Sequence, residues 1–326
     1  MTELLRNILK TMLENGGDGL DEKTALAVAE SPWEDNMDIL AAGHYVRSMY
    51  GPRATGTCAI TNAKSGRCPE NCAFCAQSAH YETGAPVYPL QGKEALLDQA
   101  REMDRHNIGR FGIVTSGTTV SDKDLDTLCE AALSIRSNCR IKLCASLGLL
   151  NEEKALRLKQ AGFDRYHHNL ETARSHFDKI CTTHDYDEDI ATLRVARKAG
   201  LSVCSCGIFG LGESWAQRVE LLATVRAEHA DCVPVNFLCP VPGTPMGKRQ
   251  PLERREALRV VALARLMLPH ADINICGGRL STLAEEQSFV LASGASCIMT
   301  GNYLTTRGLG YDDDDALLQA LGSERR

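Results

Sequence analysis

From residue 56 onward, two kinds of segment alternate along the chain. Short runs rich in β-branched and apolar residues are typical of buried strands, and longer segments with apolar positions at helical spacing are typical of amphipathic helices. The expected strands are 56–62, 110–115, 140–147, 164–170, 202–209, 232–239, 272–277 and 296–300. The expected helices are 92–106, 122–136, 151–161, 186–199, 214–229, 253–268, 282–293 and 312–321. Strands separated by helices in this way form a parallel sheet.

Eight such strand–helix units predict an α/β fold, a (β/α)8 TIM barrel. A doubly wound open sheet is the alternative. Before the first unit, Leu4, Ile8 and Met12 recur at helical spacing and Asp21 is a suitable helix cap. We therefore expect an N-terminal helical extension at 1–50 and the barrel domain at 51–326.

Composition narrows the class of protein. The chain has 326 residues, 44% hydrophobic and 24% charged, with a formal net charge of −6. Neither the charge nor any basic cluster suits nucleic acid. No signal peptide and no apolar run of membrane-spanning length is found, so a cytoplasmic protein is expected. The acidic run Asp312–Asp315 is interpreted as a solvated helix start.

Three cysteines follow the first expected strand. Cys68, Cys72 and Cys75 have the spacing C-x3-C-x2-C, with Phe74 before the third. Three thiolates this close can hold three irons of a [4Fe–4S] cluster and leave the fourth iron open to a small molecule. The loop looks like those of radical S-adenosylmethionine (SAM) enzymes. A structural zinc site needs four protein ligands, and a redox pair needs only two cysteines, so both alternatives fit three cysteines less well.

A second set of cysteines lies inside expected strands. Cys58, Cys144, Cys204, Cys206 and Cys276 all belong to odd-numbered strands. Alternate strands fill one interior layer of a (β/α)8 barrel, so these thiols can converge on its axis and hold a second iron–sulfur cluster. The alternative is that cysteine only fills a narrow core. The remaining cysteines are interpreted as small apolar residues, among them Cys129, Cys139, Cys181, Cys232 and Cys297.

Five segments together resemble one family, the biotin synthases of the radical SAM superfamily. They are CPENCAFCAQSAHYETG (68–84), YHHNLET (166–172), VCSCGIFGLGE (203–213), VPVNFLCPVPGTP (233–245) and GNYLTT (301–306). The resemblance covers about residues 50–325. It implies insertion of sulfur into dethiobiotin: a [4Fe–4S] cluster cleaves SAM, the resulting radical activates the substrate, and an auxiliary cluster donates the sulfur.

The resemblance also implies roles for particular residues. It assigns the SAM-binding cluster to Cys68, Cys72 and Cys75, and contacts to SAM to Phe74, Asn169, Glu171, Ile208, Gly210 and Gly212. It assigns substrate binding to His167, Asn169, Asn236, Thr305 and Thr306. The family usually has Asp where Glu171 stands, and Asn where His167 stands.

The auxiliary site departs from the commonest family pattern, which holds a [2Fe–2S] cluster with an arginine on strand 7. Cys144 and Cys204 are retained, but Gly112 and Asn274 replace two expected ligands. Two further cysteines on odd strands fit an all-cysteine variant of the family. We therefore expect a four-iron auxiliary cluster rather than [2Fe–2S], and the expected ligands are Cys58, Cys144, Cys204 and Cys276, with Cys206 as the alternative to Cys276. Arg110 is expected to neutralise cluster sulfide at this catalytic site.

The expected partners are dethiobiotin, a flavodoxin- or ferredoxin-like electron donor and a second copy of the chain in a homodimer. Two other functions remain open. One is a different radical SAM enzyme, a mutase or a maturase-like lyase, but these lack the cysteine pair of strands 3 and 5 within these motifs. The other is a non-enzymatic iron–sulfur sensor, which would not need Asn169 and Glu171 for SAM.

Overall fold

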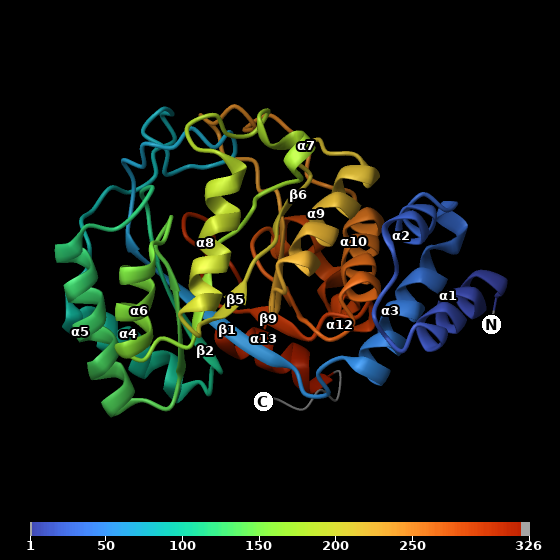
Figure 1. The fold of residues 1–326 in the computed structure, drawn as a ribbon, viewed down its shortest axis with the longest axis horizontal. Helices are drawn as coiled ribbons and strands as arrows, with labels where there is room; N and C mark the ends of the chain where they lie inside the picture. Colours follow the sequence, from blue (N-terminus) through green and yellow to red (C-terminus); the bar gives the residue numbers. More distant parts are fainter. Residues whose placement is uncertain (1, 321–326) are drawn as a thin grey trace.

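The computed structural model describes residues 2–320 and contains a closed parallel barrel surrounded by helices (Figure 1). The strands lie in the order β5-β4-β3-β2-β1-β9-β8-β7-β6. Their bounds are β1 Gly56–Lys64, β2 Arg110–Thr115, β3 Lys142–Ser146, β4 Arg165–His167, β5 Ser202–Cys204, β6 Gly207–Phe209, β7 Cys232–Phe237, β8 Asp272–Ile275 and β9 Cys297–Met299. The predicted (β/α)8 barrel is confirmed.

The expected strand 202–209 is split into β5 and β6, and both halves pair with β7. The pair Cys204↔Cys232 closes the barrel. The interruption lies at Cys206, whose N–H donates to the Asn169 side chain at 3.4 Å instead of to a neighbouring strand. Just beyond it, a Cβ on Gly207 would stand 2.3 Å from the Glu171 carbonyl oxygen, so only glycine fits this crossing.

With two exceptions, the short unpredicted α7 and the expected helix 282–293, the barrel helices follow the predicted pattern. They are α4 Lys93–Arg105, α5 Asp122–Asn138, α6 Glu152–Gln160, α7 Arg174–Phe177, α8 Tyr186–Lys198, α9 Trp215–Ala227, α10 Arg254–Met267 and α13 Tyr311–Ala320. The expected helix 282–293 is instead broken into α11 Arg279–Leu283, η2 Ala284–Ser288 and α12 Phe289–Ala292. The break falls at Ala284, whose φ of +46° is not helical. Residue 321 of the expected last helix lies outside the described residues.

The N-terminal segment is helical as predicted, with α1 Glu3–Glu14, α2 Glu22–Ala29, η1 Trp33–Asp35 and α3 Asn36–Tyr50. The Asp21 side chain caps α2 by accepting the Thr24 N–H at 2.7 Å. Of these helices, α2 and α3 lie beside α10, and α1 packs against α3 (Figure 1). As a result every residue of α10 from Ala257 to Met267 is buried, including two arginines. Of the helices between residues 2 and 320, none has both the length and the apolar character needed to cross a membrane.

Both buried arginines of α10 donate hydrogen bonds to backbone carbonyl oxygens. Arg259 donates to the carbonyl oxygens of Ala29, Ser31 and Pro32 and stacks on the Trp33 ring. Arg265 donates to the Gly294, Pro269 and Ala271 carbonyl oxygens. Burying a charged group is costly unless its donors find acceptors, so these contacts fix the N-terminal helices and the last barrel unit against α10.

The acidic start of α13 is only partly exposed to solvent, whereas the sequence predicted that all of Asp312–Asp315 would be solvated. Asp314 is 2% exposed and accepts two hydrogen bonds, at 2.6 and 2.8 Å, from the Arg279 guanidinium, which is itself 1% exposed. Asp313 remains at the surface. The buried ion pair therefore attaches α13 to α11.

Replacing Asp314 with alanine is expected to lower the free energy of unfolding by about 3–5 kcal/mol, because it leaves the buried Arg279 charge unpaired. Asp313→Ala is the matched control, since that exposed side chain only accepts the Gly310 N–H at 3.3 Å. Denaturant unfolding of the full chain measures both. Equal losses for the two variants would show that the ion pair does not hold α13.

Candidate active site

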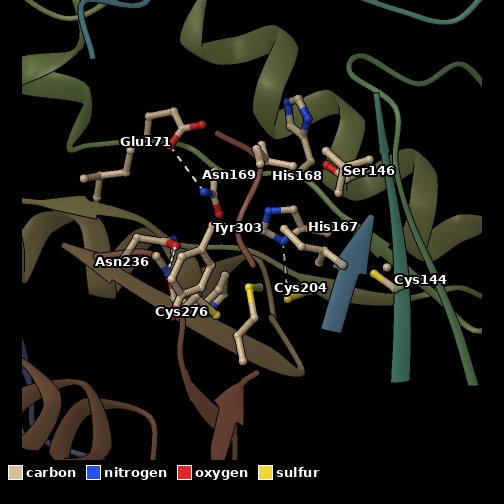
Figure 2. Close-up of a pocket in the computed structure, with 18 of the residues that line it drawn as sticks. Cys144, Ser146, His167, His168, Asn169, Glu171, Cys204, Asn236, Cys276 and Tyr303 are labelled. Carbon is tan, nitrogen blue, oxygen red and sulfur yellow. Dashed lines mark hydrogen bonds between the residues drawn. The ribbon is translucent and has the colours of Figure 1, made fainter. Parts of the chain in front are cut away.

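One cavity of about 720 Å³ occupies the barrel interior and the loops that follow the strands. Three sets of side chains line it. The first is the thiols of the loop after β1. The other two, polar residues at the end of β4 and thiols deep among the strands, are seen in Figure 2. In (β/α)8 barrels the C-terminal ends of the strands carry the chemistry. The location of this cavity therefore makes it the candidate active site.

The loop after β1 presents Cys68, Cys72 and Cys75 to the cavity. Its backbone is fixed, since the Cys68 N–H donates to the Gln77 carbonyl oxygen at 3.0 Å and the Ala73 N–H to that of Ile180 at 2.8 Å. Burial raises the pKa of Cys75 to about 11. A metal centre displaces such thiol protons on binding. Three thiols on a fixed loop fit three irons of a [4Fe–4S] cluster.

The residues after β4 form a polar pair beside this loop. The Asn169 amide donates to the Glu171 carboxyl at 3.2 Å, and the Glu171 carbonyl accepts the Ile208 N–H at 2.8 Å (Figure 2). Glu171 has a φ of +61°, a strained conformation that is often found at functional sites. Burial raises the pKa of its carboxyl to about 8. Phe74 and Ile208 line the same part of the cavity.

His167 stands between the polar pair and the deep thiols. Its Nδ1 lies 3.4 Å from the Cys204 sulfur (Figure 2). Burial lowers the pKa of His167 to about 4, so the imidazole is neutral at physiological pH. A neutral imidazole offers one donor and one acceptor, which suits a polar uncharged ligand.

The deep cysteine group consists of six thiols that line the cavity and are at most 9% exposed. Its members are Cys58, Cys144, Cys204, Cys232, Cys276 and Cys297. The Asn274 amide donates to the Cys58 sulfur at 3.1 Å. Cys276 and Cys297 lie close enough to Cys58 to form hydrogen bonds with it. Cys206 is fully buried and is not among the cavity-lining residues.

Two arginines border the deep cysteine group. Arg110 of β2 pairs with Cys58 across the sheet, and Arg165 of β4 pairs with Cys144. Arg165 also lies 3.8 Å from the Asp272 carboxylate. Burial raises the pKa of Cys144 to about 12 although both arginines act to lower it. Six thiols and two cations suit an anionic iron–sulfur cluster.

Several predicted residues lie elsewhere or are already engaged. Gly210 and Gly212 form a turn with φ of +98° and +102° and are not among the cavity-lining residues. The Asn236 side chain does line the cavity, but it accepts the Gly277 N–H at 2.9 Å and donates to the Gly207 carbonyl at 3.2 Å. Thr305 and Thr306 line the cavity from the loop after β9.

Some cavity residues escaped sequence reasoning. From the sequence alone, Cys232 and Cys297 are interpreted as small buried apolar residues, yet both line the cavity. Arg165 and Tyr303 also line it and carried no motif. Arg165 has one sequence signal, namely that it stands two and four residues before His167 and Asn169 and so shares their face of the strand.

Two family models match consecutive parts of the chain. The radical SAM superfamily model matches residues 63–225, and the Biotin and Thiamin Synthesis associated domain model matches residues 234–324. The first match contains the loop thiols, Asn169 and Glu171. The fold and the site thus define a radical SAM enzyme.

Full-length relatives give the family. A biotin synthase of Nitratidesulfovibrio vulgaris (strain Miyazaki F) is 54% identical over 93% of this chain and 86% of its own length. That of Oleidesulfovibrio alaskensis is 51% identical over 92% of this chain and 93% of its own. The biotin synthase of Citrifermentans bemidjiense is 44% identical over 99% of this chain and 98% of its own length. The chain belongs to the biotin synthase family. It is therefore a radical SAM enzyme of sulfur insertion, with a [4Fe–4S] cluster and SAM as cofactors.

Solved structures agree on the fold. Methylornithine synthase superposes with a TM-score of 0.84 at 17% identity, covering 99% of this chain and 97% of that one. The FeFe-hydrogenase maturase of Carboxydothermus hydrogenoformans superposes with a TM-score of 0.79 at 17% identity, covering 98% of this chain and 78% of that one. At such low identity the likeness concerns the barrel alone.

Proposed function

We propose that the chain converts dethiobiotin to biotin, with SAM bound at a [4Fe–4S] cluster on Cys68, Cys72 and Cys75 and with sulfur supplied by a second cluster in the deep cysteine group. The observation that carries the proposal is that both sets of thiols line one cavity. A substrate placed between them would face the SAM site on one side and the sulfur source on the other.

The cofactors would supply the radical and the sulfur, and the protein would supply position and the exclusion of water. We assign the SAM ribose to Asn169 and Glu171 and the adenine to the surface of Phe74 and Ile208. The hydrogen bond between Asn169 and Glu171 holds both groups in place before SAM arrives. For Gly210 and Gly212 we propose only an indirect role, because their turn does not reach the cavity.

For the substrate we propose His167, Asn169 and Asn236 around the ureido ring, and Thr305 and Thr306 at the carboxylate. Neutral His167 lies next to Cys204, which would bring the bound ring close to the sulfur source. Asn236 is oriented by backbone groups on both sides, so it would present a fixed edge to the ring. The hydroxyls of Thr305 and Thr306 are donors suited to a carboxylate.

For the auxiliary cluster we propose a four-iron centre on Cys58, Cys144, Cys204 and Cys276. Cys276 is favoured over Cys206 because only the former lines the cavity. Asn274 donates to the Cys58 sulfur, so it would act as a hydrogen-bond donor to a ligand rather than as a ligand. Arg110 and Arg165 would balance the negative charge of four thiolates and their cluster.

The remaining partners are proposals of the same kind. Reductive cleavage of SAM needs an electron, for which a flavodoxin- or ferredoxin-like donor is proposed. A homodimer and a cytoplasmic location are likewise proposed, the latter because fourteen cysteines suit a reducing compartment.

Two other functions fit the observations less well. A radical SAM mutase or lyase would need the loop thiols but not six buried thiols below them. A sensor would not need the polar pair Asn169 and Glu171. An iron and sulfide count separates these cases, because one cube requires about four irons per chain and two cubes about eight.

Replacing Cys144 with alanine is expected to preserve SAM binding and formation of 5′-deoxyadenosine but to abolish biotin formation. The reason is that Cys144 belongs to the proposed sulfur source and not to the SAM loop. Cys206→Ala is the matched control and is expected to retain product, while Cys72→Ala is expected to lose SAM cleavage altogether. Product and 5′-deoxyadenosine are quantified per chain after anaerobic reconstitution. Wild-type biotin yield from Cys144→Ala would contradict the assignment.

SAM affinity is expected to increase as the pH is raised through about 8. Ribose hydroxyls bind a carboxylate better than a neutral acid, and the pKa of Glu171 is about 8 in the free chain. Below that pH, affinity should change by up to about tenfold per pH unit, and above it the curve should level off. Equilibrium binding to the cluster-loaded protein measures this. Glu171→Gln should remove the pH dependence, and an unchanged slope in that variant would exclude Glu171 as its source.

Mössbauer spectra of the Cys68/Cys72/Cys75 triple-alanine variant are expected to show a four-iron centre, with about four irons per chain. Adding Cys58→Ala to this variant should reduce the bound iron, whereas adding Cys206→Ala should not. A [2Fe–2S] spectrum, or a chain without iron, would overturn the four-thiolate assignment.

A further inference from the structure

Four side chains with metal-binding atoms meet beside the SAM loop, outside the deep cysteine group. Glu70 and Cys72 come from the loop, and Cys181 and His184 come from the segment between α7 and α8. The His184 Nδ1 lies 2.7 Å from the Glu70 carboxylate and 3.3 Å from the Cys181 sulfur. The Cys181 and Cys72 sulfurs are 3.8 Å apart. The ligand atoms of Glu70, Cys181 and His184 all lie within 4.8 Å of one another.

Two of these separations match those around a tetrahedral ion. The third, the 2.7 Å between His184 Nδ1 and the Glu70 carboxylate, is a hydrogen-bond distance that would lengthen to about 3.3 Å when a metal ion replaces the proton. With Zn–S bonds of about 2.3 Å and Zn–N bonds of about 2.0 Å, two sulfurs stand about 3.8 Å apart, and a sulfur and a nitrogen about 3.5 Å apart. The measured distances between sulfurs and from sulfur to nitrogen are 3.8 and 3.3 Å. Two thiolates, one imidazole and one carboxylate form a donor set suited to Zn²⁺ or Fe²⁺.

The outer contacts of the histidine point to the same conclusion. Asp189 is 2% exposed, and its Oδ2 lies 3.4 Å from His184 Nε2. In the metal-free chain Nδ1 shares a proton with the Glu70 carboxylate. A metal ion at Nδ1 would displace that proton while Nε2 keeps its contact with Asp189, as in carboxylate–histidine–metal arrangements. His168 holds the other Asp189 oxygen at 2.7 Å. The second ligand is also supported, since Thr118 donates to the remaining oxygen of Glu70.

A network of hydrogen bonds without a metal is the competing explanation. It accounts for the contact of His184 with Glu70, whose side chains are 14% and 11% exposed. It gives no reason for the Cys72 and Cys181 thiols to face each other. Each thiol on its own would be unremarkable, but a facing pair of thiols, one of them 3.3 Å from the nitrogen of a supported histidine, is the feature that a metal ion explains.

We propose that Glu70, Cys72, Cys181 and His184 bind one divalent transition-metal ion, Zn²⁺ or Fe²⁺, in the chain that has not yet received its SAM-binding cluster. Cys72 belongs to both ligand sets, so occupation by the ion and completion of the cluster exclude each other. The ion would hold the loop and the α7–α8 segment together until the cluster takes over Cys72. Only this competition rests on the proposed function, and the metal site itself does not.

Titration of the metal-free full chain with Co²⁺ under anaerobic conditions tests the site. In a Cys68→Ala/Cys75→Ala background, the loop keeps Cys72 but cannot form a three-thiolate site of its own. One equivalent of Co²⁺, beyond any held by the deep cysteine group, is expected to bind with thiolate-to-cobalt charge-transfer bands and tetrahedral d–d bands. Adding Cys181→Ser should remove that equivalent, whereas adding Cys129→Ala, a half-buried thiol on α5, should not. Metal bound by the deep cysteine group is common to all variants and cancels in the difference.

A second variant keeps the test independent of folding. Asp189→Asn leaves all four ligands in place and is expected to weaken Co²⁺ affinity about 10–100-fold through its contact with His184. Unchanged stoichiometry, spectrum and affinity in Cys181→Ser and Asp189→Asn, with folding confirmed by circular dichroism, would overturn the metal site. Neither SAM nor substrate enters the titration, so its outcome does not depend on the proposed function.

Competition is measured separately, as the rate of cluster assembly in the wild-type chain with and without one equivalent of Zn²⁺. Slower assembly that Cys181→Ser relieves is expected. Equal rates in the presence and absence of Zn²⁺, after Co²⁺ binding has been established, would overturn the shared use of Cys72.

Discussion

The structure depends on one constraint: the barrel must close around a hollow interior. Most (β/α)8 barrels fill this space with layers of branched side chains, whereas here a cavity of about 720 Å³ remains. Several inward positions that border it carry small side chains, as at Gly112 and the six deep cysteines. Packing inside the barrel therefore contributes less stability than usual, and the outer layers must contribute more. Helix α10, buried from Ala257 to Met267 and joined to the N-terminal helices through Arg259, is where that contribution is visible.

The second consequence of the hollow barrel is that side chains of different chemistry follow one another in a fixed order along the cavity. Arg165, His167, Asn169 and Glu171 follow one another at intervals of two along β4 and its extension, and all four line the cavity. Side chains at such intervals share one face of a strand. The chain thus carries, in sequence order, a cation beside the deep thiols, a neutral imidazole, an amide and a carboxyl near the SAM loop. A single strand thereby sets the spacing between the proposed sulfur source and the proposed SAM site.

This explains how far the sequence could predict the molecule. Alternating patterns predicted the strands and helices, because each pattern is local. The split between β5 and β6 could not be predicted, since it arises from the contact of Asn169 with Cys206, which are distant in sequence. Cys232 and Cys297, in the sixth and eighth expected strands (β7 and β9), were missed for a similar reason: whether a thiol in these strands reaches the axis depends on register and on the depth at which the strand begins. Conversely, Gly210 and Gly212 were expected at the cofactor from their motif, yet the turn they form lies outside the cavity lining.

Asp189 connects the end of β4 to the segment beside the SAM loop, two parts of the site that are distant in sequence. It is a buried carboxylate on α8 that contacts His168 next to the strand axis and His184 next to the SAM loop. Its hydrogen bond is the largest of the effects that raise the pKa of His184 to about 11. A buried carboxylate must be compensated by partners, and Asp189 is compensated by both histidines. Through Asp189, α8 therefore sets the position of the SAM loop relative to β4. A substitution of either histidine is expected to disturb both ends of the cavity.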